Sequence, residues 1–429
     1  MTTDSSDIVR GESGQPTADA PGEAATPSPR VARRVALPFY AYAVLANSLF
    51  QRGVFVLYLA HQGFSAAQIA LLQTLLYIIS ALAEIPTGII ADRVGRRASI
   101  MIGQVLIASC LVGQVTLSGF PSFVALFALQ GIGMACVSGA DTALLYDLLR
   151  RRGAETHYVK VKSRYATFAA TTMALAIALG GSLQKVSWEL VYLASAGSLL
   201  LATAVLLTRV SEVRGQDAAA LDAPEAAATG GETAGKAAVL RSLTPRLASL
   251  VVVSGLMHAT MTPYLIFAQE ALSDQGIATT LVSVVMSAGF LIGGFAPLLA
   301  DQADRRLGVH LLVPLTLLVL VAALGLSSLG LAWLTIGVFL LAVGVPDTTA
   351  VVVDNVFNEG VPSRYRASLL SIITFVESLL IGCGYLALGQ LMDAFGPSSG
   401  LGWYAVVPVL ALLVSVPALR QGRWVKTAP

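Results

Sequence analysis

The stretch EIPTGIIADRVGRR, residues 84–97, joins two long hydrophobic segments and decides how the fold is interpreted. It places a glutamate within the first segment and gathers an aspartate and three arginines just before the second. Charges concentrated between apolar runs are typical of membrane-protein loops, where they meet water at the bilayer surface. The stretch therefore indicates a short loop between two membrane-spanning helices.

The composition excludes an ordinary water-soluble protein. Of the 429 residues, 55% are hydrophobic and 12% are charged, whereas a soluble protein has about 25% charged residues. The apolar residues form runs of about 20 residues, the length of a helix that crosses a bilayer. Divided at charges, prolines and turn residues, the sequence predicts twelve transmembrane helices, at 36–60, 67–91, 97–118, 121–148, 163–183, 187–208, 246–270, 277–300, 309–329, 331–357, 363–392 and 401–420.

The cations predict the orientation of these helices in a plasma membrane. Apart from Arg52 and Lys185, all of the 27 Lys and Arg residues fall on one side when the segments alternate. Because positive loops stay in the cytoplasm, both termini are expected there. The polar segments 1–35, 209–245 and 421–429 are then a disordered cytoplasmic N-terminal tail, a cytoplasmic linker and a cytoplasmic C-terminal tail. The linker separates an N-terminal six-helix bundle, 36–208, from a C-terminal one, 246–420.

The two halves of the chain repeat each other. ADRVGRR at 91–97 has a degenerate copy, ADQADRR, at 300–306, and SRYA at 163–166 has a counterpart, SRYRA, at 363–367. Each copy lies at the same place in its set of six helices. Repeats of six helices are how many secondary transporters are built.

The loop after the second helix also carries a family motif. Its residues reproduce the pattern G-x-x-x-D-R-x-G-R-R, in Gly88, Asp92, Arg93, Gly95, Arg96 and Arg97. In this motif, in its position and in the six-plus-six layout over about 36–424, the chain resembles the major facilitator superfamily. EIPTG at 84–88 and SGADTALLYD at 138–147 are similar to bacterial drug-efflux-type members. AIALGG at 176–181 has the double glycine of helix 5 in the antiporters but lacks the glycine–proline pair that precedes it there.

The resemblance implies an all-α integral membrane protein of two pseudo-symmetric six-helix bundles that rock about a central cavity. Helices 1, 4, 7 and 10 would line the cavity, while helices 2, 5, 8 and 11 would meet between the bundles. Small residues fit this scheme: Ala170, Ala174, Ala178, Gly180 and Gly181 in helix 5, and Gly289 and Gly293 in helix 8. Small residues let helix backbones approach closely, although packing within one bundle would need them too.

The resemblance also implies a gating latch at the cytoplasmic side. Asp92 would accept hydrogen bonds from an arginine of the motif and from the N-terminus of helix 11, whose dipole favours a carboxylate. Asp147, at the inner end of helix 4, would pair with Arg96 or a neighbour. The alternative role for the motif charges is to anchor the loop at the membrane surface.

Three acids within the helices are candidates for proton coupling: Glu84, Asp141 and Glu377. An ionised carboxylate inside a membrane costs several kcal/mol unless it is paired, protonated or hydrated. Glu84 has an equally weighted structural alternative beside Pro86, whose kink frees backbone groups.

Candidate residues for the substrate cavity come from three helices: Asn47, Gln51 and Arg52 in helix 1, Gln130 and Met134 in helix 4, and His258 and Thr262 in helix 7. Asn47, Gln51 and Arg52 are expected on one arc, and Gln130, Met134 and Asp141 on one face. The similar depths predicted for Arg52 and Glu377 favour an ion pair between them. His258 and the amide residues have alternatives as packing residues that join helices.

These features favour a secondary active transporter that exports a hydrophobic or amphiphilic small molecule, such as a drug, antibiotic or metabolite, against an inward flow of protons. The alternative is proton-coupled import of a small organic anion or nutrient. GGETAGKA at 230–237 lacks the hydroxyl residue and preceding strand of a phosphate-binding loop, and the four histidines are scattered singly. We therefore expect no enzyme activity, cofactor, metal or nucleic-acid partner, and a protein that works as a monomer in the lipid bilayer.

The predicted orientation can be tested by labelling single cysteines in intact cells. Reagent added outside should reach positions 120, 185, 274 and 397, which lie in predicted external turns, but not 94, 155, 225 or 304. Labelling of position 225 from outside would contradict the six-plus-six arrangement.

Overall fold

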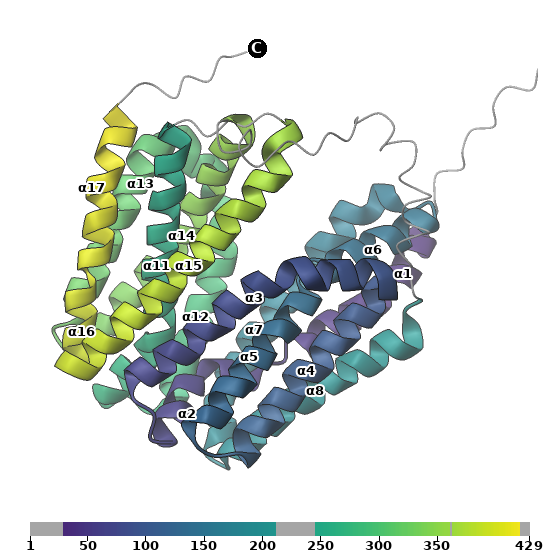
Figure 1. Cartoon of the computed structure of the whole chain (residues 1–429), viewed down its shortest axis with the longest axis horizontal. Coiled ribbons are helices and arrows are strands. Elements are labelled where there is room, and N and C mark those ends of the chain that lie inside the picture. Colours follow the sequence, from purple (N-terminus) through teal and green to yellow (C-terminus); the bar gives the residue numbers. More distant parts are fainter. Residues whose placement is uncertain (1–28, 212–244, 361–362, 421–429) are drawn as a thin grey trace, which may run out of the picture.

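The computed structural model describes residues 29–211, 245–360 and 363–420. The side chains of Pro29, Asp92 and residues 245–247, 358–371 and 416–420 lie outside this description, as do most of the residues of both predicted tails and of the linker. The described residues form helices and no strand. They are divided into an N-terminal bundle, purple to teal in Figure 1, and a C-terminal bundle, green to yellow.

The helices follow the order that the sequence predicts. The N-terminal bundle contains α1 (Pro29–Ala46), η1 (Phe50–Gly53), α2 (Phe55–His61), α3 (Ala66–Val94), α4 (Arg96–Thr116), α5 (Phe120–Val137), α6 (Ala140–Arg151), η2 (Glu155–His157), α7 (Tyr158–Gln184) and α8 (Trp188–Arg209). The C-terminal bundle contains α11 (Pro245–Asp274), α12 (Thr279–Phe295), η3 (Ala296–Leu299), α13 (Ala300–Ser327), α14 (Ala332–Gly360), α15 (Ser363–Phe395), α16 (Pro397–Tyr404) and α17 (Val406–Arg420).

Ten helical stretches of the described chain are long and apolar enough to cross a membrane. One of them, Thr279–Ser327, is 49 residues long and joins predicted helices 8 and 9 across a kink at Gly308, where φ is 65°. The first predicted helix is divided among α1, η1 and α2 and is not among the ten. The twelve-helix fold is therefore confirmed. Helix 1 is interrupted, and helices 8 and 9 form one helical stretch.

Helices 1 and 4 are not the continuous helices that the sequence predicts. Helix 1 unwinds after Ala46, where the Asn47 side-chain amide donates to the Ala43 carbonyl at 2.8 Å, in addition to the Asn47 backbone N–H at 3.2 Å. Helix 4 breaks between α5 and α6 at Gly139, whose φ of 71° suits a residue without a Cβ atom. Side-chain-to-backbone bonds and glycine both favour such interruptions, and neither alters the hydrophobic pattern.

The two bundles meet at one end of the molecule, which we call the closed end. There α3 packs against α15, and α7 packs against α12. The carboxylate of Asp393, near the end of α15, accepts hydrogen bonds from the backbone N–H groups of Ala66 and Ala67 at 2.8 and 3.1 Å. These N–H groups begin α3, so the helix dipole adds to the attraction. Deeper along the same pair, the Thr74 hydroxyl donates to the Gly382 carbonyl at 2.9 Å.

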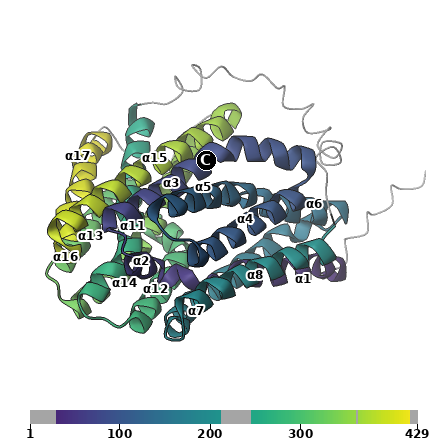
Figure 2. The same cartoon turned by 60° about the horizontal axis from the view of Figure 1, so that its bottom comes forward.

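The bundles diverge from the closed end toward the opposite, open end, where α1 begins and α17 finishes (Figure 1). Turned by 60°, the molecule shows α3 and α15 side by side (Figure 2), in agreement with their contact. The second half of α3 bends toward α6, and Pro86 lies in this part of the helix. A proline removes a backbone hydrogen bond and kinks a helix.

The contact between α7 and α12 confirms part of the expectation for helix 5: Ala174, Ala178 and Gly181 lie between the bundles, whereas Gly180 meets helix 1 of its own bundle. The hydroxyl of Ser287 donates to the Ala174 carbonyl at 2.7 Å, and that of Ser283 to the Ala178 carbonyl at 3.2 Å. A Cβ atom on Gly181 would lie 2.7 Å from the carbonyl oxygen of Thr279. The backbones of helices 5 and 8 thus touch directly.

The corresponding expectation for helix 8 is wrong. A Cβ atom on Gly289 would meet the ring of Phe339 at 2.8 Å, and one on Gly293 would meet the carboxylate of Asp347 at 2.9 Å. Both neighbours belong to α14, so these glycines serve packing within the C-terminal bundle. In α12 the contacts with helix 5 are made by residues 279–287, on the other face of the helix.

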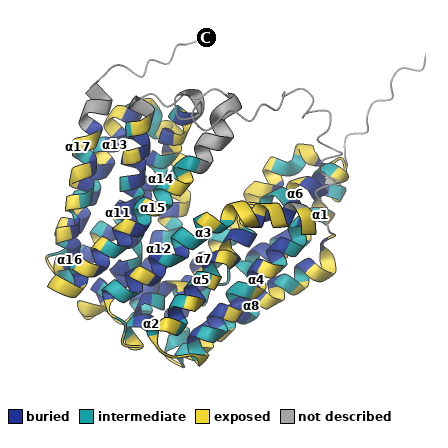
Figure 3. Cartoon of the chain, in the orientation of Figure 1, coloured by how far each residue is buried: buried dark blue, intermediate teal, exposed yellow. Residues whose placement is uncertain are grey.

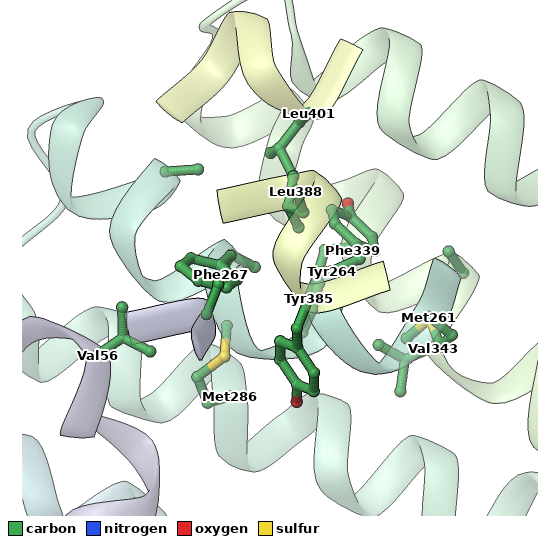
Figure 4. Packing of buried hydrophobic residues seen from close by; sticks show 14 of the residues in the cluster. Val56, Met261, Tyr264, Phe267, Met286, Phe339, Val343, Tyr385, Leu388 and Leu401 are labelled. Atoms are coloured by element: carbon green, nitrogen blue, oxygen red, sulfur yellow. The ribbon is translucent and has the colours of Figure 1, made fainter. Parts of the chain in front are cut away.

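Buried residues lie between the helices and exposed ones cover the outside of both bundles (Figure 3). Many exposed side chains are large and apolar, for example Leu341 at 74% and Trp333 at 73%. In water such a surface would be unfavourable, but it suits helices that face lipid. Inside the C-terminal bundle, Tyr264, Phe267, Phe339 and Leu388 form part of a continuous packed core (Figure 4).

A substitution at Gly180 tests the crossing between helices 1 and 5. A methyl group there would lie 2.1 Å from the Phe50 carbonyl oxygen, so we expect Gly180→Ala to lower stability by about 1–3 kcal/mol. Gly197→Ala in α8 is the control, because nothing lies within 4 Å of a Cβ atom there and alanine is the better helix former. Thermal melting in detergent should show a lower midpoint for the first variant only; equal midpoints would contradict the close approach.

Candidate functional site

A cavity of about 170 Å³ lies near the closed end, mainly within the N-terminal bundle. The break in helix 1 places Gln51 and Arg52 on the 3-10 turn η1 instead of on an α-helical face. Both residues line the cavity, whereas Asn47, expected on the same arc, does not. The full lining is Leu49, Gln51, Arg52, Phe55, Gln73, Leu76, Tyr77, Ile107, Leu111, Gln114, Phe127, Gln130, Met134, Ile266 and Tyr385.

The cavity is largely apolar and has one charged side chain, that of Arg52. Gln114 donates to Gln130 at 3.1 Å, which fixes two of the four lining glutamines. The buried Oε1 of Gln51 and the buried hydroxyl of Tyr385 have no hydrogen-bond partner in the described part of the chain. Figure 4 shows the Tyr385 hydroxyl on the side of the ring that points away from Leu388 and the packed core. Unsatisfied buried groups of this kind favour a polar ligand.

The other bundle supports the broken backbone of helix 1. The amide of Gln269, on α11, donates to the Arg52 carbonyl at 3.2 Å and accepts from the Val56 backbone N–H at 3.4 Å. Gln269 is 1% exposed. Because buried backbone groups need partners, this one side chain stabilises the conformation that turns Arg52 into the cavity.

The sequence predicts that Asp141 shares a face with Gln130 and Met134, and this prediction is wrong. That prediction assumed one continuous helix, but the break at Gly139 separates α6 from α5 and changes the direction of the side chain. The Asp141 carboxylate accepts a hydrogen bond from the Tyr165 hydroxyl at 2.8 Å. Tyr165 stacks on Tyr42, with ring centroids 6.4 Å apart, so Asp141 belongs to an interior network between helices 1, 4 and 5.

A second polar group lies in the C-terminal bundle. Glu377 on α15 accepts a hydrogen bond from the Ser254 hydroxyl at 2.9 Å, and its Oε1 lies 3.7 Å from Nδ1 of His258. The second distance is that of an ion pair when the imidazole is protonated, and it is too long for a hydrogen bond. About a quarter of each of the two side chains is exposed, at 25% and 23%. Thr262, one turn further along α11, is half-buried and takes no part in this group.

The predicted pair of Arg52 with Glu377 is therefore wrong in this conformation. Along α11, the contact of Arg52 is at Gln269 and the contact of Glu377 is at His258. Eleven residues separate them, which is roughly 16 Å at 1.5 Å per residue. Counting residues from the predicted helix ends failed because α1 begins at Pro29 and then unwinds.

Two further acids lie near this group, and the sequence did not identify them as site candidates. Asp347, on α14, interacts electrostatically with His258, and Asp354 does so with both His258 and Glu377. Gly293 leaves room for the Asp347 carboxylate, as described above. The signal for Asp347 was its position directly after Pro346, inside an apolar run. The C-terminal bundle thus gathers three acids and one histidine on helices 7, 10 and 11.

The motif residues lie at the open end. Arg96 forms an ion pair with Asp147 at 2.5 Å, as predicted, and Arg97 donates to the Val210 carbonyl at 2.7 Å. Gly95, with φ of 115°, makes the tight turn between α3 and α4. Arg93 is exposed, and no atom lies within 4 Å of a Cβ atom placed on Gly88. The side chain of Asp92 lies outside the described residues, and its latch remains a prediction.

Glu84 is exposed and borders a cavity of about 380 Å³ between α3 and the break in helix 4. Its neighbour Thr87 donates to the Ala83 carbonyl at 2.7 Å, beside the kink at Pro86. This bond ends one residue after the Leu82 carbonyl that Pro86 deprives of its helical partner, so it does not involve the Glu84 side chain or the group freed by the proline. The structural role that the sequence suggested for Glu84 receives no support from these contacts.

Residues 39–385 match the family model of the Major Facilitator Superfamily. The chain belongs to this superfamily. It is consequently a membrane transporter that carries small molecules, and its twelve helices form the fold expected of that family.

Three transporters of known structure resemble this chain. The crystal structure of the nucleoside transporter NupG has a TM-score of 0.72 and 14% identity, and the match covers 91% of this chain and 100% of that chain. A bacterial homologue of the human lysosomal transporter Spinster, in an inward-facing and occupied conformation, has a TM-score of 0.71, 15% identity and coverages of 92% and 98%. The peptide transporter POT in complex with sulfate has a TM-score of 0.67, 15% identity and coverages of 90% and 94%. No curated protein sequence matches the chain.

The Arg96–Asp147 pair can be measured by a double-mutant cycle. Asp147 is largely buried, with a side-chain exposure of 9%, so removing one partner leaves a poorly solvated charge. We expect Arg96→Gln and Asp147→Asn each to lower the thermal midpoint, and the double variant to lose less than the sum. A coupling of about 1–3 kcal/mol is expected; additive losses would contradict the pair.

Proposed function

We propose that this transporter exports an amphiphilic small molecule against an inward flow of protons, by alternating access between its two bundles. The observation that carries the proposal is the cavity beside Arg52, which is closed at one end by the contacts between bundles. An apolar lining with one cation and several amide and hydroxyl groups suits a substrate with an apolar body and a polar head. Arg52 orients that head.

The group around His258 and Glu377 is the proposed site of proton coupling. Coupling requires a carboxylate whose proton affinity differs between the two states of the transporter. Glu377 is the candidate because its partners, Ser254 and His258, lie on α11, while α15 also packs against α3 of the other bundle. A relative movement of the bundles shifts α15 and changes the surroundings of the acid. Asp141 and Glu84 remain secondary candidates.

The positive-inside pattern assigns the open end to the cytoplasm. On this proposal the conformation described above is inward-facing, in the plasma membrane, with both termini in the cytoplasm. The Arg96–Asp147 pair, together with Asp92 and the N-terminus of helix 11, would form the cytoplasmic latch when the bundles close there. The outer contact between Asp393 and α3 would then open.

Direction and coupling are tested together in energised everted vesicles, whose interior is acidic. Accumulation of an amphiphilic dye that stops when the proton gradient is collapsed supports export. Uptake of a small organic anion by right-side-out vesicles would identify an importer instead. Transport that ignores the gradient in both preparations contradicts proton coupling.

Glu377→Gln should abolish gradient-driven accumulation while downhill exchange of the dye continues, because the neutral amide keeps the shape but cannot release a proton. His258→Gln should weaken accumulation in the same assay, by removing the electrostatic partner. Glu155→Gln is the matched control, since Glu155 is exposed on η2 and away from the cavity.

The control should retain accumulation. Full accumulation by Glu377→Gln would exclude this residue from the coupling step. Loss of both accumulation and exchange would mean that Glu377 serves the transport cycle in another way. Asp141→Asn is measured in the same assay. It distinguishes a contribution to coupling by the interior network of helices 1, 4 and 5 from one by the group in the C-terminal bundle.

A further inference from the structure

A groove of about 560 Å³ runs between α1 and α7 on the N-terminal bundle, apart from the cavity beside Arg52. Its lining combines basic and apolar side chains, and no carboxylate contributes to it. The lining residues on α1 are Ala32, Arg33, Ala36, Leu37 and Tyr40, and those on η2 and α7 are His157, Lys160, Val161, Arg164, Thr167 and Phe168.

The basic residues of this groove converge from two helices. Lys160 and Arg164 are four residues apart on α7 and share a face, while Arg33 approaches from α1. All three are exposed, and within the described chain none of them forms an ion pair with an acid. Three neighbouring cations without a carboxylate repel one another. An anion bound among them would relieve that repulsion.

The groove changes from charged to apolar along its length. Both α1 and α7 begin at the open end, so Arg33 near the start of α1, His157 at the end of η2 and Lys160 in the first turn of α7 lie near the same level. Leu37 and Tyr40 follow Arg33 on one face of α1, and Tyr40 is roughly 10 Å further into the membrane at 1.5 Å per residue. Phe168 lies at the corresponding depth on α7, with its ring centroid 5.2 Å from that of Tyr40.

This order is that of a membrane lipid, with the headgroup at the surface and the acyl chain inside. Leu37 is 63% exposed and Phe168 is 44% exposed, so an apolar chain has side chains to contact. A soluble anion such as inorganic phosphate would use the basic end alone and leave the aromatic end unexplained. Basic pockets between transmembrane helices are suited to anionic headgroups.

We propose that the groove between α1 and α7 binds an anionic phospholipid, with its phosphate among Arg33, Lys160 and Arg164 and an acyl chain against Leu37, Tyr40 and Phe168. The site does not depend on the direction or the coupling of transport. Because α7 also forms a contact with α12, a lipid held here touches a helix that joins the two bundles.

The experiment is native mass spectrometry of the full chain in micelles that contain equal amounts of phosphatidylglycerol and phosphatidylcholine. The wild type should retain phosphatidylglycerol in preference to phosphatidylcholine. The variant Arg33→Gln/Lys160→Gln/Arg164→Gln should lose that preference by roughly fivefold for each cation removed, since each contributes about 1 kcal/mol near an anionic surface. Excess inorganic phosphate should not displace the lipid.

The control variant is Arg152→Gln/Lys162→Gln/Arg209→Gln. It removes the same charge from exposed residues at the same end of the bundle that do not line the groove. The proposal holds if the control keeps the preference of the wild type. It is overturned if both triple variants lose the preference equally, if neither loses it, or if inorganic phosphate displaces the lipid.

Phe168→Ala gives a second test in which every cation is kept. It should weaken retention of long-chain phosphatidylglycerol while leaving retention of a short-chain form unchanged, because only the long chain reaches Phe168. Equal weakening of both forms, or of neither, contradicts the proposed orientation of the lipid.

Discussion

The structure depends on one close contact, in which the carbonyl oxygen of Phe50 lies against Gly180. Only a residue without a Cβ atom permits this approach, since a methyl group there would lie 2.1 Å from the oxygen. The next residue, Gly181, permits a similar approach by the backbone of α12. Helices 1, 5 and 8 therefore cross at a pair of glycines, and the two bundles touch at the end of the molecule where this crossing lies.

The unwound part of helix 1 connects that crossing to the cavity. In a continuous helix the backbone N–H and C=O groups would bond to one another. Here Gln269 of the opposite bundle supplies hydrogen bonds to two of these groups. The cost of breaking the helix is offset by these bonds and by the Asn47 and Ser48 side chains, which bond to carbonyls one turn earlier. The result is a short turn that directs Arg52 into an apolar cavity. A movement of α11 relative to the N-terminal bundle would disturb this turn directly.

Charge is divided between the bundles in a way that suits transport. The cavity of the N-terminal bundle has a cation and neutral hydrogen-bonding groups, while the C-terminal bundle gathers Glu377, Asp347, Asp354 and His258. On the proposed function, the substrate and the proton would bind at separate places and would influence each other through the relative position of the bundles, without a direct contact. The basic groove between α1 and α7 adds a third polar region, at the level where the helices enter the membrane.

The sequence by itself determined the twelve helices, their six-plus-six division and the superfamily, because bilayer thickness sets the length of each apolar run and the motif combines glycines and charges at fixed spacing. It also predicted the Arg96–Asp147 pair and the place of Ala174, Ala178 and Gly181 of helix 5 between the bundles. Only the tertiary structure decided where helices 1 and 4 break, that Glu377 contacts His258 instead of Arg52, and that Asp347 joins them. Residue counting gives the depth of a side chain along an unbroken helix, but it contains no information on the rotation of that helix or on bonds from a distant one. These long-range contacts, above all those of Gln269 and Gly180, fix which polar side chains meet.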